Sequence, residues 1–124
     1  ITGVIMNQQT VDIFNPKTIR ATMGSIFRVP FVYVPELSPV LTQMHEKGIH
    51  TYAAHLKGKE YYDSFSFREP TAFLIGNEGN GLTKEISDQS GQYLKIPMEG
   101  KVESLNASIA AALLMYEAHR QRKL

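Results

Sequence analysis

Several residue types and patterns are missing from this sequence, and each absence excludes a class of protein. There is no cysteine, which excludes a disulfide framework, a zinc ribbon and a thiol nucleophile. No apolar run approaches the roughly 18 residues of a membrane-spanning helix, so we expect no membrane-spanning segment. Neither charge sign dominates, because 13 Lys and Arg stand against 12 Asp and Glu, a formal net charge of +1. The chain as a whole therefore has no strong field that would attract nucleic acid.

The composition is that of a folded globular domain. Hydrophobic residues make up 43% and charged residues 20% of the 124 residues, which argues against disorder. This length is enough for one domain with a core and too short for two ordinary ones, so we expect a single domain. Because the chain begins with Ile1 on an apolar stretch, we also expect it to be part of a longer protein.

Short apolar runs alternate with segments of helical character along the chain. The runs predict strands at residues 1–6, 31–34, 49–54, 71–75 and 93–96. Capping residues, prolines and glycines predict helices at residues 17–23, 38–48, 83–91 and 104–122, and the polar, aromatic stretch 55–70 is predicted to be a loop. This alternation predicts an α/β fold, with a mostly parallel sheet and helices on both faces.

A glycine-rich turn follows the fourth predicted strand, where residues 75–82 read Ile-Gly-Asn-Glu-Gly-Asn-Gly-Leu. Glycines allow a backbone to approach a ligand closely, and ligands of open α/β sheets bind at the carboxyl ends of strands. The G-x-x-G-x-G spacing is neither a dinucleotide fingerprint nor a phosphate loop. A ligand site and a simple tight connection are equally consistent with it, and Glu78 taken alone is best explained as a solvated turn residue.

Three short polar side chains, Ser104, Asn106 and Ser108, lie at the start of the last predicted helix. One of them suffices as a helix cap, so we expect this helix start to face something polar as well. Further along, Ile109, Leu113 and Tyr116 form an apolar stripe. An ordinary core-facing helix is the preferred interpretation of the stripe, although the many alanines would also allow a partner helix to pack closely.

Basic residues gather in two segments without acids, 15–28 and 119–123. Both are candidates for phosphate contacts, and the second is equally explained by the dipole of the last helix. The four histidines have no metal-ligand spacing, and no Ser–His–Asp arrangement is supported.

Three segments together resemble the SpoU/TrmH family of RNA ribose 2′-O-methyltransferases, within the SPOUT superfamily. They are residues 15–30, residues 73–82, and residues 96–98 with 104–110. The resemblance covers nearly the whole chain. It implies an α/β fold with a deep trefoil knot at the carboxyl end, a homodimer that meets through the knots, S-adenosylmethionine as methyl donor, RNA as substrate and a cytoplasmic location. No metal is required.

The resemblance also implies roles for particular residues. Catalytic roles fall on Glu78, Ser104 and Asn106. Cofactor-binding roles fall on Gly76, Asn77, Glu78, Gly79, Gly81, Ile96, Pro97, Met98, Ser104, Leu105 and Asn106. Weaker substrate-binding roles fall on Arg20, Ser25 and Arg28.

One feature of the family is absent from this sequence. The family's catalytic arginine belongs to an earlier strand–helix unit with an Asn-x-x-x-x-x-Arg pattern, and Arg20 is not its equivalent. We therefore expect residues 1–124 to be a SpoU-type catalytic domain that lacks its N-terminal strand–helix unit. Alone, it should bind the cofactor weakly and transfer methyl groups poorly or not at all.

Three other interpretations remain open from the sequence. The substrate could be transfer RNA, although the residues of the motifs resemble most closely those of family members that act on ribosomal RNA. The chain could be a non-catalytic knotted module that binds RNA or a subunit. With the three motifs ignored, a flavodoxin-like domain would be the preferred interpretation.

Overall fold

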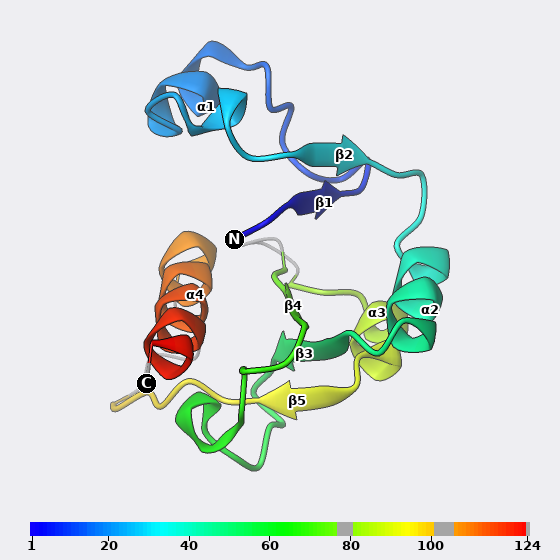
Figure 1. The fold of residues 1–124 in the computed structure, drawn as a ribbon, viewed down its shortest axis with the longest axis vertical. Coiled ribbons are helices and arrows are strands. Elements are labelled where there is room, and N and C mark those ends of the chain that lie inside the picture. Colours follow the sequence, from blue (N-terminus) through cyan, green and yellow to red (C-terminus); the bar gives the residue numbers. More distant parts are fainter. Residues whose placement is uncertain (77–80, 101–105, 124) are drawn as a thin grey trace. The chain divides into compact units, whose positions relative to one another are not determined.

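The structure, a computed structural model, describes residues 1–76, 81–100 and 106–123 (Figure 1). Its contacts divide the chain into two compact units, residues 1–37 and 38–124, called unit 1 and unit 2 below. All the strand pairs found among the described residues are parallel, which confirms the predicted α/β class. The sequence predicted one sheet, whereas the hydrogen bonds define a two-stranded sheet in unit 1 and a three-stranded sheet in unit 2.

Unit 1 is a strand–helix–strand unit. Strand β1 (Val4–Met6) pairs with β2 (Phe31–Tyr33), and helix α1 (Pro16–Ala21) lies between them in the sequence. The side chain of Asn15 caps α1 by accepting a hydrogen bond of 2.9 Å from the backbone N–H of Lys17, and Pro16 occupies the first turn, as the sequence predicted. A 3₁₀ turn follows at Ser25–Phe27.

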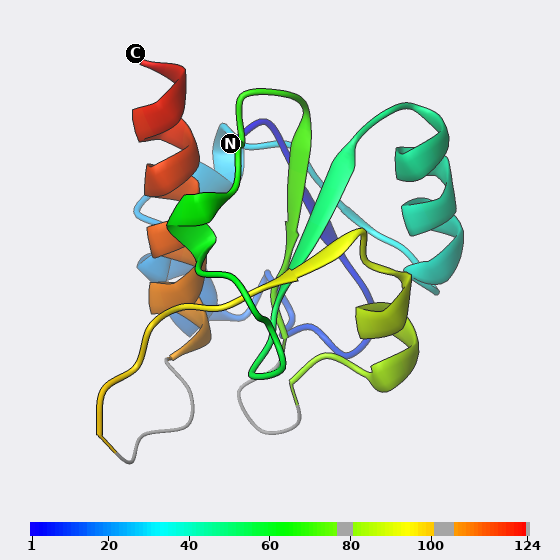
Figure 2. The ribbon, with the colours of Figure 1, turned by 90° about the horizontal axis from the view of Figure 1, so that it is seen from below.

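The sheet of unit 2 has the order β4-β3-β5. These strands are β3 (His50–Ala54), β4 (Thr71–Leu74) and β5 (Gln92–Leu94). Helices α2 (Ser38–Glu46) and α3 (Lys84–Gln89) cover one face of the sheet, and α4 (Ala107–Arg122) covers the other (Figure 2). This confirms the prediction of helices on both faces. None of the helices in the described part of the chain has the length and apolar character needed to cross a membrane.

The core of unit 2 lies between the sheet and α4. It is formed by Tyr52, Phe67, Leu94 and Leu114, and the rings of Tyr52 and Phe67 meet edge-on with their centroids 5.1 Å apart. Phe67 is fully buried, although it belongs to the stretch 55–70 that was predicted to be a loop. That stretch is mostly irregular, with one 3₁₀ turn at Tyr62–Ser64, so the prediction missed its contribution to the core.

The apolar stripe of α4 does not face this core, so the core interpretation of the stripe was wrong. Ile109, Leu113 and Tyr116 are 53%, 37% and 75% exposed. The buried face is instead the one that carries Leu114 and Gln121. The stripe repeats at i, i+4 and i+7, and the buried residues Leu114, Glu117 and Gln121 repeat at i, i+3 and i+7. Both spacings are typical of one helix face, so spacing alone does not distinguish them.

Candidate functional site

The carboxyl ends of β3, β4 and β5 form the candidate site. Because these strands are parallel, the segments that follow them leave the sheet at one edge, which is where open α/β sheets bind ligands. The segments begin at His55, Ile75 and Lys95. The second and third of them carry the two most specific motifs of the sequence.

The glycine turn after β4 is closed tightly at its base. A Cβ atom added to Gly76 would lie 2.5 Å from the carbonyl carbon of Gly81 and 2.5 Å from the backbone nitrogen of Leu82, so only glycine fits there. Gly81 has a φ of +65°, a conformation that favours glycine. Both glycines are therefore required by the geometry of the turn. The candidate residues Asn77, Glu78 and Gly79 lie outside the described residues.

The segment after β5 is held in place by backbone hydrogen bonds. The N–H of Lys95 donates to the carbonyl of Glu60, and the N–H of Tyr62 donates to the carbonyl of Lys95, both at 2.9 Å. The next three residues are the candidates Ile96 and Met98, which are half-buried, and Pro97, which is exposed. These three residues therefore leave the sheet from a fixed point, Lys95, at the same end of the sheet as the glycine turn.

Asn106 caps the N-terminus of α4. Its Oδ1 accepts hydrogen bonds from the backbone N–H groups of Ser108 at 2.9 Å and Ile109 at 3.3 Å, and from the hydroxyl of Ser108. Capping therefore accounts for Asn106 and Ser108 together. The side chain of Asn106 is exposed and has a further interaction besides these. Ser104 and Leu105 lie outside the described residues.

The predicted substrate-side residues all belong to unit 1. Arg20 lies in the last turn of α1. Ser25 begins the 3₁₀ turn, and its carbonyl accepts a hydrogen bond of 2.9 Å from the N–H of Arg28. All three side chains are exposed, so unit 1 presents a hydroxyl and two guanidinium groups within one short stretch of chain.

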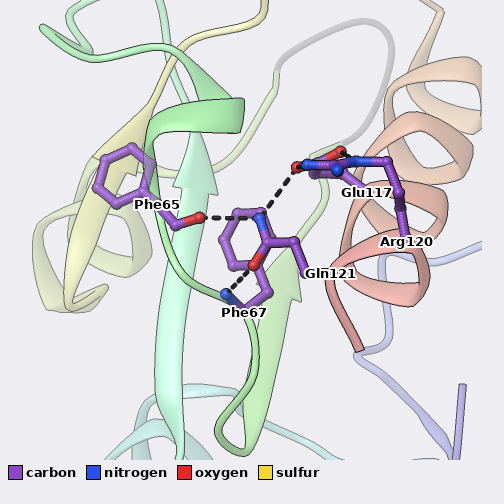
Figure 3. Close-up of polar contacts among 5 residues, drawn as sticks. All are labelled: Phe65, Phe67, Glu117, Arg120 and Gln121. Atoms are coloured by element: carbon purple, nitrogen blue, oxygen red, sulfur yellow. Dashed lines mark hydrogen bonds and ion pairs between the residues drawn. The ribbon is translucent and has the colours of Figure 1, made fainter. Parts of the chain in front are cut away.

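A buried amide ties α4 to the segment that leads into β4 (Figure 3). The Oε1 of Gln121 accepts from the N–H of Phe67 at 2.6 Å, and its Nε2 donates to the carbonyl of Phe65 and to Glu117 at 2.9 Å each. The guanidinium of Arg120 donates twice to the Glu117 carboxylate. We call this set of residues the Gln121 clamp. It joins α4, which Asn106 caps, to the segment that leads into β4, the strand that the glycine turn follows.

The charge of Glu117 is stabilised inside the clamp. Hydrogen bonds from Arg120 and then from Gln121 lower the pKa of the Glu117 carboxyl to about 2, and the residue is only 8% exposed. Arg122 adds two donors, to the carbonyls of Phe67 at 2.9 Å and Glu69 at 3.0 Å. The sequence predicted that the basic end of α4 contacts phosphate or interacts favourably with the helix dipole. It did not indicate that Arg122 donates to the backbone of the segment before β4.

Sequence reasoning also missed the loop that follows β3. A Cβ on Gly58 would lie 2.9 Å from the carbonyl carbon of Leu94, so this loop is pressed against the end of β5. The ring of His55 stacks on that of Tyr93 with centroids 4.6 Å apart. The only signal in the sequence was a glycine between two lysines, which is not specific.

A hollow of about 250 Å³ lies at the opposite edge of the sheet, near the start of β3. Its buried hydroxyl on Thr51 bonds to His45 Nε2 and accepts from the N–H of Gly91, both at 2.8 Å. These polar groups are hydrogen-bonded to one another, and the hollow lies near the start of β3, whereas the glycine turn follows the end of β4. We therefore assign the hollow no function. Among the described residues, no group of three or more His, Cys, Asp or Glu is placed to hold a metal ion.

The fold and the site together define a parallel α/β protein with a glycine-closed turn and a capped helix at the ligand-binding edge. The profile of the SpoU rRNA Methylase family matches residues 1–116. The chain belongs to this family, which confirms the resemblance and removes the flavodoxin-like alternative.

Relatives extend this result. The chain is 34% identical, over 98% of its length, to a protein of Staphylococcus haemolyticus described as a TrmH family tRNA/rRNA methyltransferase. It covers 49% of that protein, so the chain spans about half the length of the curated relatives it matches.

Solved structures agree with the sequence relatives. An rRNA methyltransferase from Sinorhizobium meliloti with bound AdoMet superposes with a TM-score of 0.85 at 32% identity, over 96% of this chain and 46% of that one. The SpoU methyltransferase AviRb from Streptomyces viridochromogenes, in complex with the cofactor AdoMet, gives a TM-score of 0.88 at 34% identity, over 97% and 47%.

Proposed function

We propose that residues 1–124 are the SpoU-type catalytic domain, without its first strand–helix unit, of an enzyme that methylates a ribose 2′-hydroxyl of RNA in the cytoplasm. S-adenosylmethionine is the proposed donor. The observation that carries this proposal is the lack of room for a Cβ atom at Gly76, beside Gly81 and Leu82, at the carboxyl end of β4. Two related structures with similar folds contain AdoMet by their descriptions.

The described residues fit such a cofactor. The backbones of Gly76 and Gly81 carry no side chains that would block a close approach, and Ile96 to Met98 leave the sheet at the same edge. When bound, S-adenosylmethionine supplies a methyl group on a positively charged sulfur. We assign binding to Gly76, Gly81 and Ile96 to Met98, and also to Asn77, Glu78, Gly79, Ser104 and Leu105 on the strength of their motifs.

The remaining roles concern the hydroxyl that is methylated. A ribose hydroxyl is a weak nucleophile, so it needs a hydrogen-bond acceptor and firm positioning. We assign this positioning to Glu78, Ser104 and Asn106, and contacts with the RNA to Arg20, Ser25 and Arg28. The family's arginine is not among these residues, which is why we expect little turnover from this stretch alone.

Ribosomal RNA is the proposed substrate. The matching family is described by rRNA methylation, and the Sinorhizobium meliloti relative is described as an rRNA methyltransferase. Transfer RNA is the alternative, because the Staphylococcus haemolyticus relative is described as a tRNA/rRNA methyltransferase. A map of 2′-O-methyl positions by primer extension in a deletion strain distinguishes them: a lost ribosomal site supports the proposal, and a lost transfer RNA site overturns it.

The knot and the homodimer complete the proposal. The family relationship supports a carboxyl-terminal trefoil knot. The exposed stripe of Ile109, Leu113 and Tyr116 on α4 supports a helical partner, since three apolar side chains in line favour burial. A second copy of the chain is the partner we propose.

Calorimetry with S-adenosylmethionine tests the proposal directly. We expect saturable binding by the 124-residue chain, tighter binding by the full-length protein, and methyl transfer to ribosomal RNA only by the latter. Absence of binding by both proteins would favour the non-catalytic module. Full turnover by the 124 residues would show that the missing unit is dispensable.

A further inference from the structure

The loop between β3 and the 3₁₀ turn places two lysines beside the candidate site. Lys57 and Lys59 are both exposed, and the loop between them is fixed by Gly58, whose N–H donates to the carbonyl of His55 at 3.0 Å. The N–H of Lys57 donates to Nδ1 of the His55 ring, also at 3.0 Å. The two lysine side chains therefore start from an anchored backbone, and Gly58 between them packs against Leu94 at the end of β5.

A shallow hollow of about 280 Å³ lies against these lysines. Its lining is Lys57, Lys59, Glu60, Phe65, Gln92 and Tyr93. Lysines next to aromatic side chains are a combination that binds single-stranded nucleic acid, by phosphate pairing and by stacking. We call it the lysine hollow.

The described acidic groups around the hollow make no close ion pair with either lysine. Among the residues that the structure describes, neither lysine has an acidic partner at ion-pair distance. Nearby, Asp88 accepts from the Tyr93 hydroxyl at 2.9 Å and pairs with Lys84 at 3.5 Å, and the charge of Lys57 also helps to lower the pKa of its carboxyl. Glu60 is the one carboxylate in the lining, so positive charge is in excess there.

We propose that the lysine hollow binds the phosphate backbone of the substrate RNA next to the nucleotide that is methylated. This inference rests on the proposed function, since it concerns the RNA of that same site. The hollow follows β3 and borders β5, whose carboxyl ends contribute to the candidate site. The simpler explanation is that the lysines only protect the exposed edge of β5 from pairing with another chain.

Salt-dependent binding of a fluorescein-labelled 20-nucleotide single-stranded RNA separates these explanations. Each phosphate contact contributes about 0.7 to the slope of log affinity against log salt concentration. We expect Lys57→Gln and Lys59→Gln each to lower the slope by about that amount, and the double variant to bind about tenfold more weakly at low salt. Lys57→Arg with Lys59→Arg should keep the wild-type slope, because the charge is retained.

Lys47→Gln is the matched control, because Lys47 is an exposed lysine that follows α2 at the other edge of the sheet. It should leave the slope unchanged. A wild-type slope in the double glutamine variant, an equal loss in Lys47→Gln, or failure of the wild-type chain to bind the RNA would each overturn the inference. Calorimetry with S-adenosylmethionine is run on the same samples. Absence of cofactor binding by the wild-type chain would overturn the proposed function. RNA binding that depends on the two lysines would still support the proposed role of the lysine hollow.

Discussion

At the scale of single residues, Gln121 has the largest structural role that sequence reasoning did not anticipate. Its amide makes three hydrogen bonds, two of them to the backbone of the Phe65–Phe67 stretch. That stretch has no strand partner of its own, so its polar groups need side-chain partners when its rings enter the core. The buried position of a glutamine on a helix is explained by this need.

Gln121→Ala should therefore be strongly destabilising. It leaves the N–H of Phe67 and the carbonyl of Phe65 without their partners, and each buried unsatisfied group costs about 1–3 kcal/mol. We expect the free energy of unfolding in urea to fall by about 2–4 kcal/mol. Gln43→Ala, on the exposed side of α2, is the control and should change it by less than about 0.5 kcal/mol. Equal effects in the two variants would argue against the clamp.

Glu117 should contribute a pH-dependent part of the stability. Its pKa is about 2 in the folded chain against an ordinary value of 4.5, so its ionised form stabilises the fold above about pH 4.5. That contribution is lost as the pH falls from about 4.5 to about 2. We expect Glu117→Gln to flatten this part of the curve of unfolding free energy against pH. Glu46→Gln, exposed on α2, should keep the wild-type slope, and an unaltered slope in Glu117→Gln would contradict the prediction.

At the scale of elements, the turn after β4 and the start of α4 were predictable because their chemistry is local. Glycines at sites without room for a Cβ, and an asparagine before a helix, act within a few residues of their own backbone. The sequence accordingly located both elements. It extended the last helix back to Ser104, whereas the described helix begins at Ala107 with Asn106 as its cap.

Gly76→Ala should damage the turn and with it cofactor binding. The added methyl group would meet two backbone atoms at 2.5 Å, and backbone is costly to displace. We expect affinity for S-adenosylmethionine, measured by calorimetry, to fall more than about tenfold. Gly3→Ala is the matched control, because its Cβ would meet only the Pro30 carbonyl oxygen at an ordinary 3.5 Å. Wild-type affinity in Gly76→Ala would remove the support that this turn gives to the proposed function.

Two substitutions at Asn106 separate capping from a role in methyl transfer. Asp retains the cap, whereas Ala loses it at a cost of about 1 kcal/mol. We expect Asn106→Asp to keep the unfolding free energy within about 0.5 kcal/mol and still to reduce methyl transfer by the full-length enzyme. Normal transfer rates in Asn106→Asp would limit this residue to capping. Thr83→Ser, at the cap of α3, serves as a conservative control for both measurements.

At the scale of the whole molecule, the question is what covers the stripe on α4. A charged residue in the middle of a dimer contact is costly to bury, so Tyr116→Glu should shift the chain to the monomer in light scattering after size exclusion. Leu56→Glu, which changes another exposed apolar residue in unit 2, should leave the mass unchanged. A wild-type chain that is already monomeric at high concentration would contradict the proposed homodimer.

The Phe65–Phe67 stretch and the two faces of α4 mark the limit of sequence reasoning on the fold. Phe65-Ser66-Phe67 alternates as a strand would, but charges and turn residues surround it, so a loop was the better local prediction. On α4, Ile109, Leu113 and Tyr116 are more apolar than the buried face, which includes Glu117 and Gln121. Apolar periodicity therefore pointed to the wrong face, because the backbone partners of the buried Gln121 lie more than 50 positions away in the chain.

The sequence by itself determined the order of strands and helices, the parallel α/β class, the cap of α1 and the family, because each depends on local chemistry or on motifs. The tertiary structure decided which face of α4 enters the core, how the Gln121 clamp satisfies the segment before β4, and why Gly76 and Gly58 have no room for a side chain. Those outcomes depend on atoms brought together from distant positions, where burial makes every unpaired polar group and every added methyl group costly.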